Sequence, residues 1–211
     1  MKVAILGASG MTGKQLIEQA LSAGHTVIGL ARTPEKILFE DPRVIKRQAD
    51  GFDEASVIAA LEGADAVITT VGKRDLRDKR VNLSTAAHAG VVAGMRKHGI
   101  KRLLVISSIG AARIKRNGIR RNIYLFLRRK YYRDMYDMEL QVMASGMDVT
   151  MLRAPLLYDG PVSGQYDIIE KEIYPNGLRI TRADLAHFIL KELAENNWIN
   201  RVIAVSYPLE T

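Results

Sequence analysis

Hydrophobic and polar positions alternate between two periods along the first half of this 211-residue chain. Short apolar runs rich in β-branched residues are typical of strands, and they occur at residues 2–6, 26–31, 43–47, 64–71 and 101–107. Between these runs, apolar residues recur every three or four positions, which predicts helices over residues 12–23, 54–61 and 82–97. Strands and helices that alternate in this way predict parallel βαβ units with right-handed crossovers.

The pattern changes after residue 107. It predicts a helix over 131–144, a strand over 148–153, a helix over 182–194 and a last strand over 201–206. Between residues 155 and 164, prolines and glycines mark an irregular stretch of the kind that carries substrate loops in such sheets. The expected fold class is therefore α/β. It is a single-domain Rossmann fold over residues 1–211, with a doubly wound, mostly parallel sheet, helices on both faces and a substrate-side region at about 108–180.

A glycine-rich loop separates the first predicted strand from the first helix. Gly7 permits the tight turn, Gly10 lets the backbone approach a pyrophosphate, and Gly13 allows the helix to pack closely. The start of the helix offers free N–H groups and a positive dipole end to phosphates, and Ser9 and Thr12 add hydroxyl donors. The alternative is a strand-turn-helix junction that binds nothing. The candidate cofactor residues in this loop are Gly7, Ser9, Gly10, Met11, Thr12 and Gly13.

The end of the second strand bears on which dinucleotide would bind. NAD sites usually present an acidic residue about 20 residues after the loop, whereas a 2′-phosphate is met by arginine. This strand ends in Arg32 and Thr33 with no acid, so NADP(H) is expected in preference to NAD(H), and Lys36 is a weaker second candidate. The alternative is that Arg32 is a solvated residue that tolerates either cofactor.

Two further strand ends face the expected ligand crevice, because ligands in doubly wound sheets bind at the carboxyl ends of the strands. Asp50 and Gly51 follow the third strand, and Asp50 is a candidate for holding the adenine amino group. Thr70, Val71 and Gly72 end the fourth strand, where Gly72 would let the dinucleotide pass close to the backbone. Each of these residues alone is compatible with a simple loop role.

Composition excludes several classes of protein. The chain has no Cys, which removes disulfides, thiolate metal sites and thiol chemistry, and its four histidines show no metal-ligand spacing, so no metal is expected. No apolar run reaches the roughly 18 to 20 residues that span a bilayer, and the first strand leads directly into Gly7, so a soluble, unprocessed cytoplasmic protein is expected.

The net charge of +8 is concentrated in the segment 110–133, which holds nine basic residues and no acid. The rest of the chain is nearly neutral, so this is not a general nucleic-acid signature, and no specific nucleic-acid partner is expected. The segment could attract an anionic ligand, a membrane surface or another protein. Alternatively, it is a solvated helix face with its apolar residues packed inward.

Several stretches resemble the atypical short-chain dehydrogenase/reductase group that includes the NmrA-like proteins and, most closely, the branch of biliverdin reductase B, also called flavin reductase. The stretches are the glycine loop, residues 65–68 before Gly72, residues 95–99, Ser107 and Ser108, residues 179–190, and residues 206–208. The resemblance implies NADPH-dependent hydride delivery to a planar conjugated acceptor. It assigns Arg32 to the 2′-phosphate and Ser108 to the nicotinamide or substrate side. Where that branch has a His after a Pro, this chain has Leu156, so tetrapyrrole specificity does not carry over.

The chain lacks the Tyr and Lys pair, four residues apart, that reduces carbonyls in most short-chain dehydrogenases. At that spacing Tyr131 is followed by Met135 and Tyr132 by Tyr136, so ordinary alcohol or ketone chemistry is disfavoured. Ser108 is the expected catalytic side chain, with a strand-capping hydroxyl as the alternative. Tyr132, Leu156 and Tyr158 are the substrate candidates, although for the two tyrosines packing under a loop is the favoured alternative to stacking on a planar acceptor. Ser107 and Pro155 complete the expected cofactor contacts.

Two hypotheses follow. The first is an NADPH-dependent reductase of a flavin, a quinone or a similar planar acceptor, with flavin as a substrate and not as a bound cofactor. The second is an NmrA-like regulator or redox sensor that binds NAD(P) without turnover. A sugar-nucleotide epimerase or dehydratase is disfavoured by the missing Tyr and Lys pair and the small C-terminal region.

Overall fold

The first strand lies near the middle of an eight-stranded sheet with the order β3-β2-β1-β4-β5-β6-β10-β8. The structure is a computed structural model that describes residues 1–72, 82–114, 128–171, 174–175 and 177–209. Neighbouring strands of this sheet are parallel except β10 and β8. Its strands are β1 (Lys2–Leu6), β2 (Thr26–Ala31), β3 (Val44–Gln48), β4 (Ala66–Thr69), β5 (Arg102–Ser108), β6 (Asp148–Ala154), β8 (Asp167–Ile169) and β10 (Arg201–Ser206).

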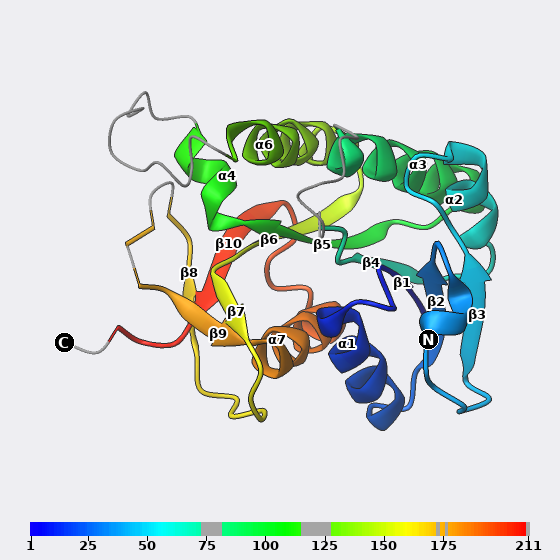
Figure 1. The fold of residues 1–211 in the computed structure, drawn as a ribbon, viewed down its shortest axis with the longest axis horizontal. Coiled ribbons are helices and arrows are strands. Elements are labelled where there is room, and N and C mark those ends of the chain that lie inside the picture. The colour runs from blue at the N-terminus through cyan, green and yellow to red at the C-terminus, as the bar shows by residue number, and fades with distance from the viewer. Residues whose placement is uncertain (73–81, 115–127, 172–173, 176, 210–211) are drawn as a thin grey trace.

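Helices cover both faces of this sheet (Figure 1). On one face lie α1 (Met11–Ser22) and α7 (Arg182–Glu195). On the other lie α2 (Glu54–Ala60), α3 (Leu83–His98) and α6 (Arg129–Met143). The predicted doubly wound, mostly parallel sheet with helices on both faces is therefore confirmed, and the predicted strands and helices agree with the observed ones to within a few residues.

Each face of the sheet has its own hydrophobic core. Ile5, Leu16 and Ile189 are fully buried between the sheet and the α1 and α7 helices. On the other side, Val91 and Leu103 are fully buried and Met138 almost so. Because both faces are covered, the central strands consist almost entirely of apolar residues, which is why the sequence shows them as continuous runs.

Several short elements were not anticipated. They are α4 (Ile109–Ile114), the strands β7 (Leu156–Tyr158) and β9 (Arg179–Thr181), the antiparallel β8, and the 3-10 helix η1 (Pro34–Lys36) after β2. β7 and β9 form a separate two-stranded parallel sheet. Strands of three residues are too short to show a hydrophobic period, so the sequence could not reveal them.

The order of the strands defines a crevice. The chain passes from β1 outward to β2 and β3, then returns to place β4 on the other side of β1. The connections after β1 and β4 therefore diverge at the carboxyl ends of these two strands, and this is where open α/β sheets bind ligands. None of the helices in the described ranges is long and apolar enough to cross a bilayer.

Candidate functional site

The turn after β1 requires glycine at positions 7 and 13. Gly7 has a φ of +94°, in the left-handed region, and a Cβ there would collide with the Thr70 hydroxyl. A Cβ on Gly13 would collide with the Gly7 carbonyl oxygen and lie 2.8 Å from Ala8 Cα. At Gly10, by contrast, a Cβ would meet only the Gly7 oxygen, at 3.1 Å. The space over Gly10 is thus open to a ligand, whereas Gly7 and Gly13 close the turn.

The N-terminus of α1 has unused hydrogen-bond donors. The first bond within the helix is donated by the Lys14 N–H to the Gly10 carbonyl at 3.0 Å, so the N–H groups of Met11, Thr12 and Gly13 have no acceptor in the helix. Gly10 provides no side-chain cap, and the first turn carries no acidic residue. This helix end is therefore suited to an anion.

A cavity of about 220 Å³ lies at the carboxyl ends of β4, β5 and β6. Several residues predicted from the sequence as site residues line it: Thr12, Thr70, Val71, Gly72, Ser107, Ser108 and Pro155. The other lining residues were not predicted, and they are Ile106, Tyr131, Met135, Ala154 and Leu157. Because Thr12 belongs to the first turn of α1, the cavity adjoins the glycine loop.

Ser108 and Tyr131 bring hydroxyl groups to this cavity from opposite elements. The Ser108 hydroxyl oxygen accepts a hydrogen bond from the Gly110 N–H at 3.2 Å, which fixes its position at the end of β5. Tyr131 lies in the first turn of α6, and a Cβ on Gly72 would come within 3.7 Å of its hydroxyl. Met135 follows Tyr131 on the same helix face, at the position where the short-chain dehydrogenase pair has a Lys, and its thioether carries no charge.

Buried hydrogen bonds connect the helices around the cavity. The Asp134 carboxylate accepts bonds from the Ser84 and Thr85 N–H groups, at 2.8 and 3.0 Å, and thereby caps α3 from the neighbouring helix. His88 lies one turn later and bonds the Thr69 hydroxyl through Nε2 at 2.8 Å. Burial lowers the pKa of His88 to about 4, so this imidazole is neutral at physiological pH.

A second buried cluster lies beneath the cavity. The Ser107 hydroxyl donates to Glu139 Oε1 at 2.5 Å, and Arg153 Nη2 donates to Glu139 Oε2 at 2.7 Å. Burial alone would lower the pKa of Arg153, but its hydrogen bonds to Glu139 and the charge of that carboxylate raise it. The guanidinium therefore stays charged and paired. Sequence reasoning missed Glu139, because a carboxylate in a highly charged helix is more often exposed.

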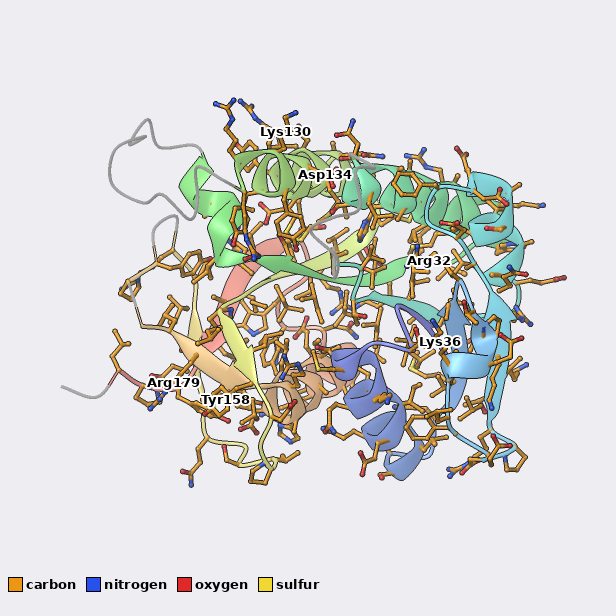
Figure 2. The ribbon with its side chains drawn as sticks, viewed as in Figure 1. Arg32, Lys36, Lys130, Asp134, Tyr158 and Arg179 are labelled. Carbon is orange, nitrogen blue, oxygen red and sulfur yellow. The ribbon has the colours of Figure 1, made fainter. Side chains whose placement is uncertain are left out.

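Arg32 and Lys36 stand at the outer end of the crevice (Figure 2). Arg32 follows β2 directly, Lys36 ends η1, and both side chains are exposed on the same side of the molecule. Within the described part of the chain, neither side chain has a hydrogen bond or ion pair. Thr33, the residue before η1, is also exposed. These groups are available to a ligand at the end of β2.

Asp50 and Gly51 have local structural roles in this structure. The Asp50 carboxylate accepts a bond from the Phe52 N–H at 3.1 Å, and its carbonyl accepts one from the Asp53 N–H at 2.8 Å, which forms the turn into α2. A Cβ on Gly51 would lie 2.8 Å from the Ala87 Cβ, so this glycine allows close packing against α3. The second Asp50 carboxylate oxygen has no bond within the described residues.

Three substrate candidates lie outside the lining of this cavity. Tyr132 is 92% buried against Gly110 and Ala111, and its neighbour Tyr131 enters the cavity instead. Leu156 is 69% exposed, whereas Leu157 lines the cavity. Tyr158 lines a separate, open groove beside Tyr207.

The geometry of helices and strands explains why a neighbouring residue lines the cavity in place of Tyr132 and of Leu156. One step along a helix rotates the side chain by about 100°, and one step along a strand turns it to the opposite face. Figure 2 shows Tyr158 near Arg179, on the side of the molecule opposite Arg32 and Lys36.

Part of the predicted basic segment 110–133 falls outside the described residues, because 115–127 are not described. Its role as a partner surface therefore stays a prediction. Among the side chains that the structure describes, no cluster of His, Asp or Glu could hold a metal ion.

Comparisons with known proteins identify sequence relatives and structures of similar fold. The UPF0659 protein YMR090W of Saccharomyces cerevisiae is 27% identical over 208 residues, covering 93% of this chain and 88% of that protein. ChuY, an anaerobilin reductase of Escherichia coli O157:H7, has a TM-score of 0.82 at 21% identity, with full coverage of both chains. A wide-type short-chain dehydrogenase/reductase of Veillonella parvula in complex with NADP has a TM-score of 0.76 at 18% identity, covering 98% of this chain and 94% of that one.

These two structures share the fold of this protein. The family model described as NAD(P)H-binding matches residues 7–196, from the first glycine of the loop to the end of α7. The chain therefore belongs to the NAD(P)H-binding family.

Proposed function

We propose that this protein is an NADPH-dependent reductase that delivers hydride to a flavin, a quinone or a similar planar conjugated acceptor. The observation that carries the proposal is the cavity of about 220 Å³ that adjoins the free N-terminus of α1 through Thr12. A dinucleotide has a pyrophosphate at its centre and a nicotinamide at one end. The N-terminus of α1 would bind the pyrophosphate, and the adjoining cavity would receive the nicotinamide. Residues at about 108–180 would supply the substrate side of a single domain.

The residues present fit the dinucleotide. Open space above Gly10 and the free N–H groups of Met11, Thr12 and Gly13 suit the pyrophosphate. Arg32, with Thr33 and Lys36 beside it, suits a 2′-phosphate, since a guanidinium binds phosphate through two parallel bonds. When bound, NADPH supplies the hydride. The protein contributes orientation, by enclosing the nicotinamide end between β4, β5, β6 and α6.

Two features of the cavity support an acceptor that needs little acid–base assistance, such as a flavin or a quinone. Ser108 accepts a bond from Gly110, and its hydroxyl hydrogen has no acceptor within the described residues, so it is available to donate to a reacting oxygen or nitrogen. The residue four positions after Tyr131 is Met135, so the sequence lacks the Tyr and Lys pair that carbonyl reduction uses. Flavins and quinones need less assistance, because their reduced forms take protons from water. ChuY, a protein of similar fold, is named a reductase, which supports reductase activity here.

The Met135 position also supports a second candidate, which is an NmrA-like regulator that binds the dinucleotide without turning it over. The two candidates differ in one observable. A reductase oxidises NADPH faster when an acceptor is supplied, whereas a regulator binds NADPH with an unchanged oxidation rate.

A binding titration tests the cofactor preference. Arg32→Ala should weaken NADPH binding about ten- to a hundredfold, as expected for a lost hydrogen bond to a charged group, and leave NADH binding unchanged. Arg201→Ala is the matched control, because Arg201 is 62% exposed at the amino end of β10, away from the crevice. Equal weakening of both cofactors in Arg32→Ala would refute the NADP preference.

An acceptor screen then tests turnover. NADPH oxidation is followed at 340 nm with FMN, riboflavin or menadione as the acceptor, for the wild type and for Ser108→Ala. The reductase proposal expects faster oxidation with at least one acceptor and a lower kcat in Ser108→Ala. Tight NADPH binding with no acceleration by any acceptor would exclude the reductase and favour the regulator.

A further inference from the structure

Two buried clusters of the same chemistry join β5 and β6 at opposite ends. At the carboxyl end, Glu139 of α6 binds Arg153 of β6 at 2.7 Å and accepts the Ser107 hydroxyl of β5 at 2.5 Å. Both oxygens of Glu139 also lie 3.2 Å from Arg153 Nε. The side chains of Glu139 and Arg153 are 4% and 13% exposed. We call Ser107, Glu139 and Arg153 the upper cluster.

The lower cluster consists of Arg102, Thr150 and Glu192. Arg102, the first residue of β5, binds Glu192 of α7 at 2.7 Å, and the Thr150 hydroxyl of β6 donates to Glu192 at 2.9 Å. The side chains of Arg102 and Glu192 are 10% and 1% exposed. Each cluster thus contains one arginine, one glutamate and one hydroxyl, and each links the same two strands to a helix.

Only the upper cluster borders the cavity. Ser107 lines it and precedes Ser108, Arg153 directly precedes the lining residues Ala154 and Pro155, and Glu139 lies one helical turn after Met135. The described residues that line the cavity include no member of the lower cluster. The Glu139 carboxylate therefore links the three elements β5, β6 and α6, each of which contributes residues to the cavity lining.

We propose that Glu139 and Arg153 are positioning residues, which hold the ends of β5, β6 and α6 at the spacing that the nicotinamide end requires. The inference rests on the proposed function. A carboxylate that accepts from two other elements at once fixes their distances, because a shift of any one of them breaks a buried charge-assisted bond. The pairing of β5 with β6 holds Ser108 beside Ala154, so loss of the anchor would chiefly let α6, with Tyr131, move relative to Ser108 and Pro155. Misplacement by about 1 Å can lower a rate a hundredfold.

The test compares matched variants of the two clusters. Glu139→Gln and Glu192→Gln each remove the charge of a buried glutamate. Arg153→Lys and Arg102→Lys each keep the charge and remove the guanidinium, which makes several hydrogen bonds at once in both clusters, so the second pair is available if the first does not fold. Urea unfolding first identifies a temperature at which every compared variant is folded. NADPH titration by fluorescence then reports the environment of the bound nicotinamide, and acceptor turnover gives kcat and KM.

The upper variants should show a shifted emission of bound NADPH and a kcat about ten- to a hundredfold lower, with a smaller change in KM. The lower variants should lose stability to a similar degree while keeping the wild-type emission and kcat. Equal effects from both clusters, or wild-type emission and kcat in the upper variants, would overturn the inference. If the wild type itself fails to bind NADPH, the proposed function fails first, so the two failures are distinguishable.

Discussion

Acid should destabilise this protein through one buried histidine. His88 is fully buried on α3, and its Nδ1 lies 2.8 Å from the Ser84 carbonyl oxygen, which can only accept. Nδ1 therefore carries the proton and Nε2 accepts from the Thr69 hydroxyl. Burial lowers the pKa of His88 from 6.5 to about 4, against smaller raising effects of Ser84 and of the Asp134 charge.

The size of the effect follows from that shift. At pH 7 the imidazole is neutral in the native protein and mostly neutral in the unfolded one, so nearly its full contribution to stability is present. Below the unfolded pKa of 6.5, the unfolded state takes up a proton and the native state does not, until the pH reaches about 4. From pH 7 to pH 5, the free energy of unfolding should therefore fall by about 2 kcal/mol through His88 alone.

Urea unfolding of the wild type and of His88→Gln, at pH 7 and at pH 5, measures this contribution. Glutamine keeps a polar side chain beside Thr69 but does not titrate, so the variant should lose about 2 kcal/mol less than the wild type over this interval. The contributions of all other titrating groups cancel in the difference between the two proteins. Between pH 7 and pH 8 their free energies of unfolding should change in parallel. Equal losses between pH 7 and pH 5 would show that burial does not hold His88 neutral.

Two further substitutions have defined outcomes. Gly13→Ala should abolish NADPH binding in a fluorescence titration, because its Cβ would meet Gly7 and Ala8, whereas Gly24→Ala, at φ +79° in open space, should cost about 1 kcal/mol of stability and leave binding unchanged. Asp134→Asn should lower the unfolding free energy by about 1 to 2 kcal/mol, because it removes the charge that caps α3. Asp137 is exposed on the same helix, so Asp137→Asn should change the unfolding free energy little. Equal effects of the two substitutions in urea unfolding would contradict the capping role.

The sequence predicted the sheet well because its central strands are buried on both sides. β1 and β2 appear as apolar runs with the bounds that the structure gives, and the glycine loop lies between β1 and α1 as expected. Much of the cavity lining, including Thr70, Gly72 and Ser108, was also predictable, because the carboxyl ends of parallel strands meet at one edge of a sheet.

The remaining lining depended on contacts between distant residues. Leu157 enters the cavity in place of Leu156 because β7 pairs with β9, more than twenty residues later, and this pairing decides which side chains face the core. Tyr131 enters in place of Tyr132 because the rotation of α6 is set by its packing, including the bond from Asp134 to α3. Periodicity within a single segment contains no information about either contact.

Because several strands meet at one crevice, cofactor binding there would also raise the stability of the whole fold and so slow degradation of the protein. A dinucleotide bound as proposed, by the loop after β1 and by the ends of β4, β5 and β6, would contact elements that come together only in the folded chain. At a cofactor concentration a hundred times its dissociation constant, binding adds about 2.7 kcal/mol to the free energy of unfolding. Proteases act on unfolded chains, so a cell that runs short of the cofactor would clear this protein faster, and its abundance would follow the nicotinamide supply.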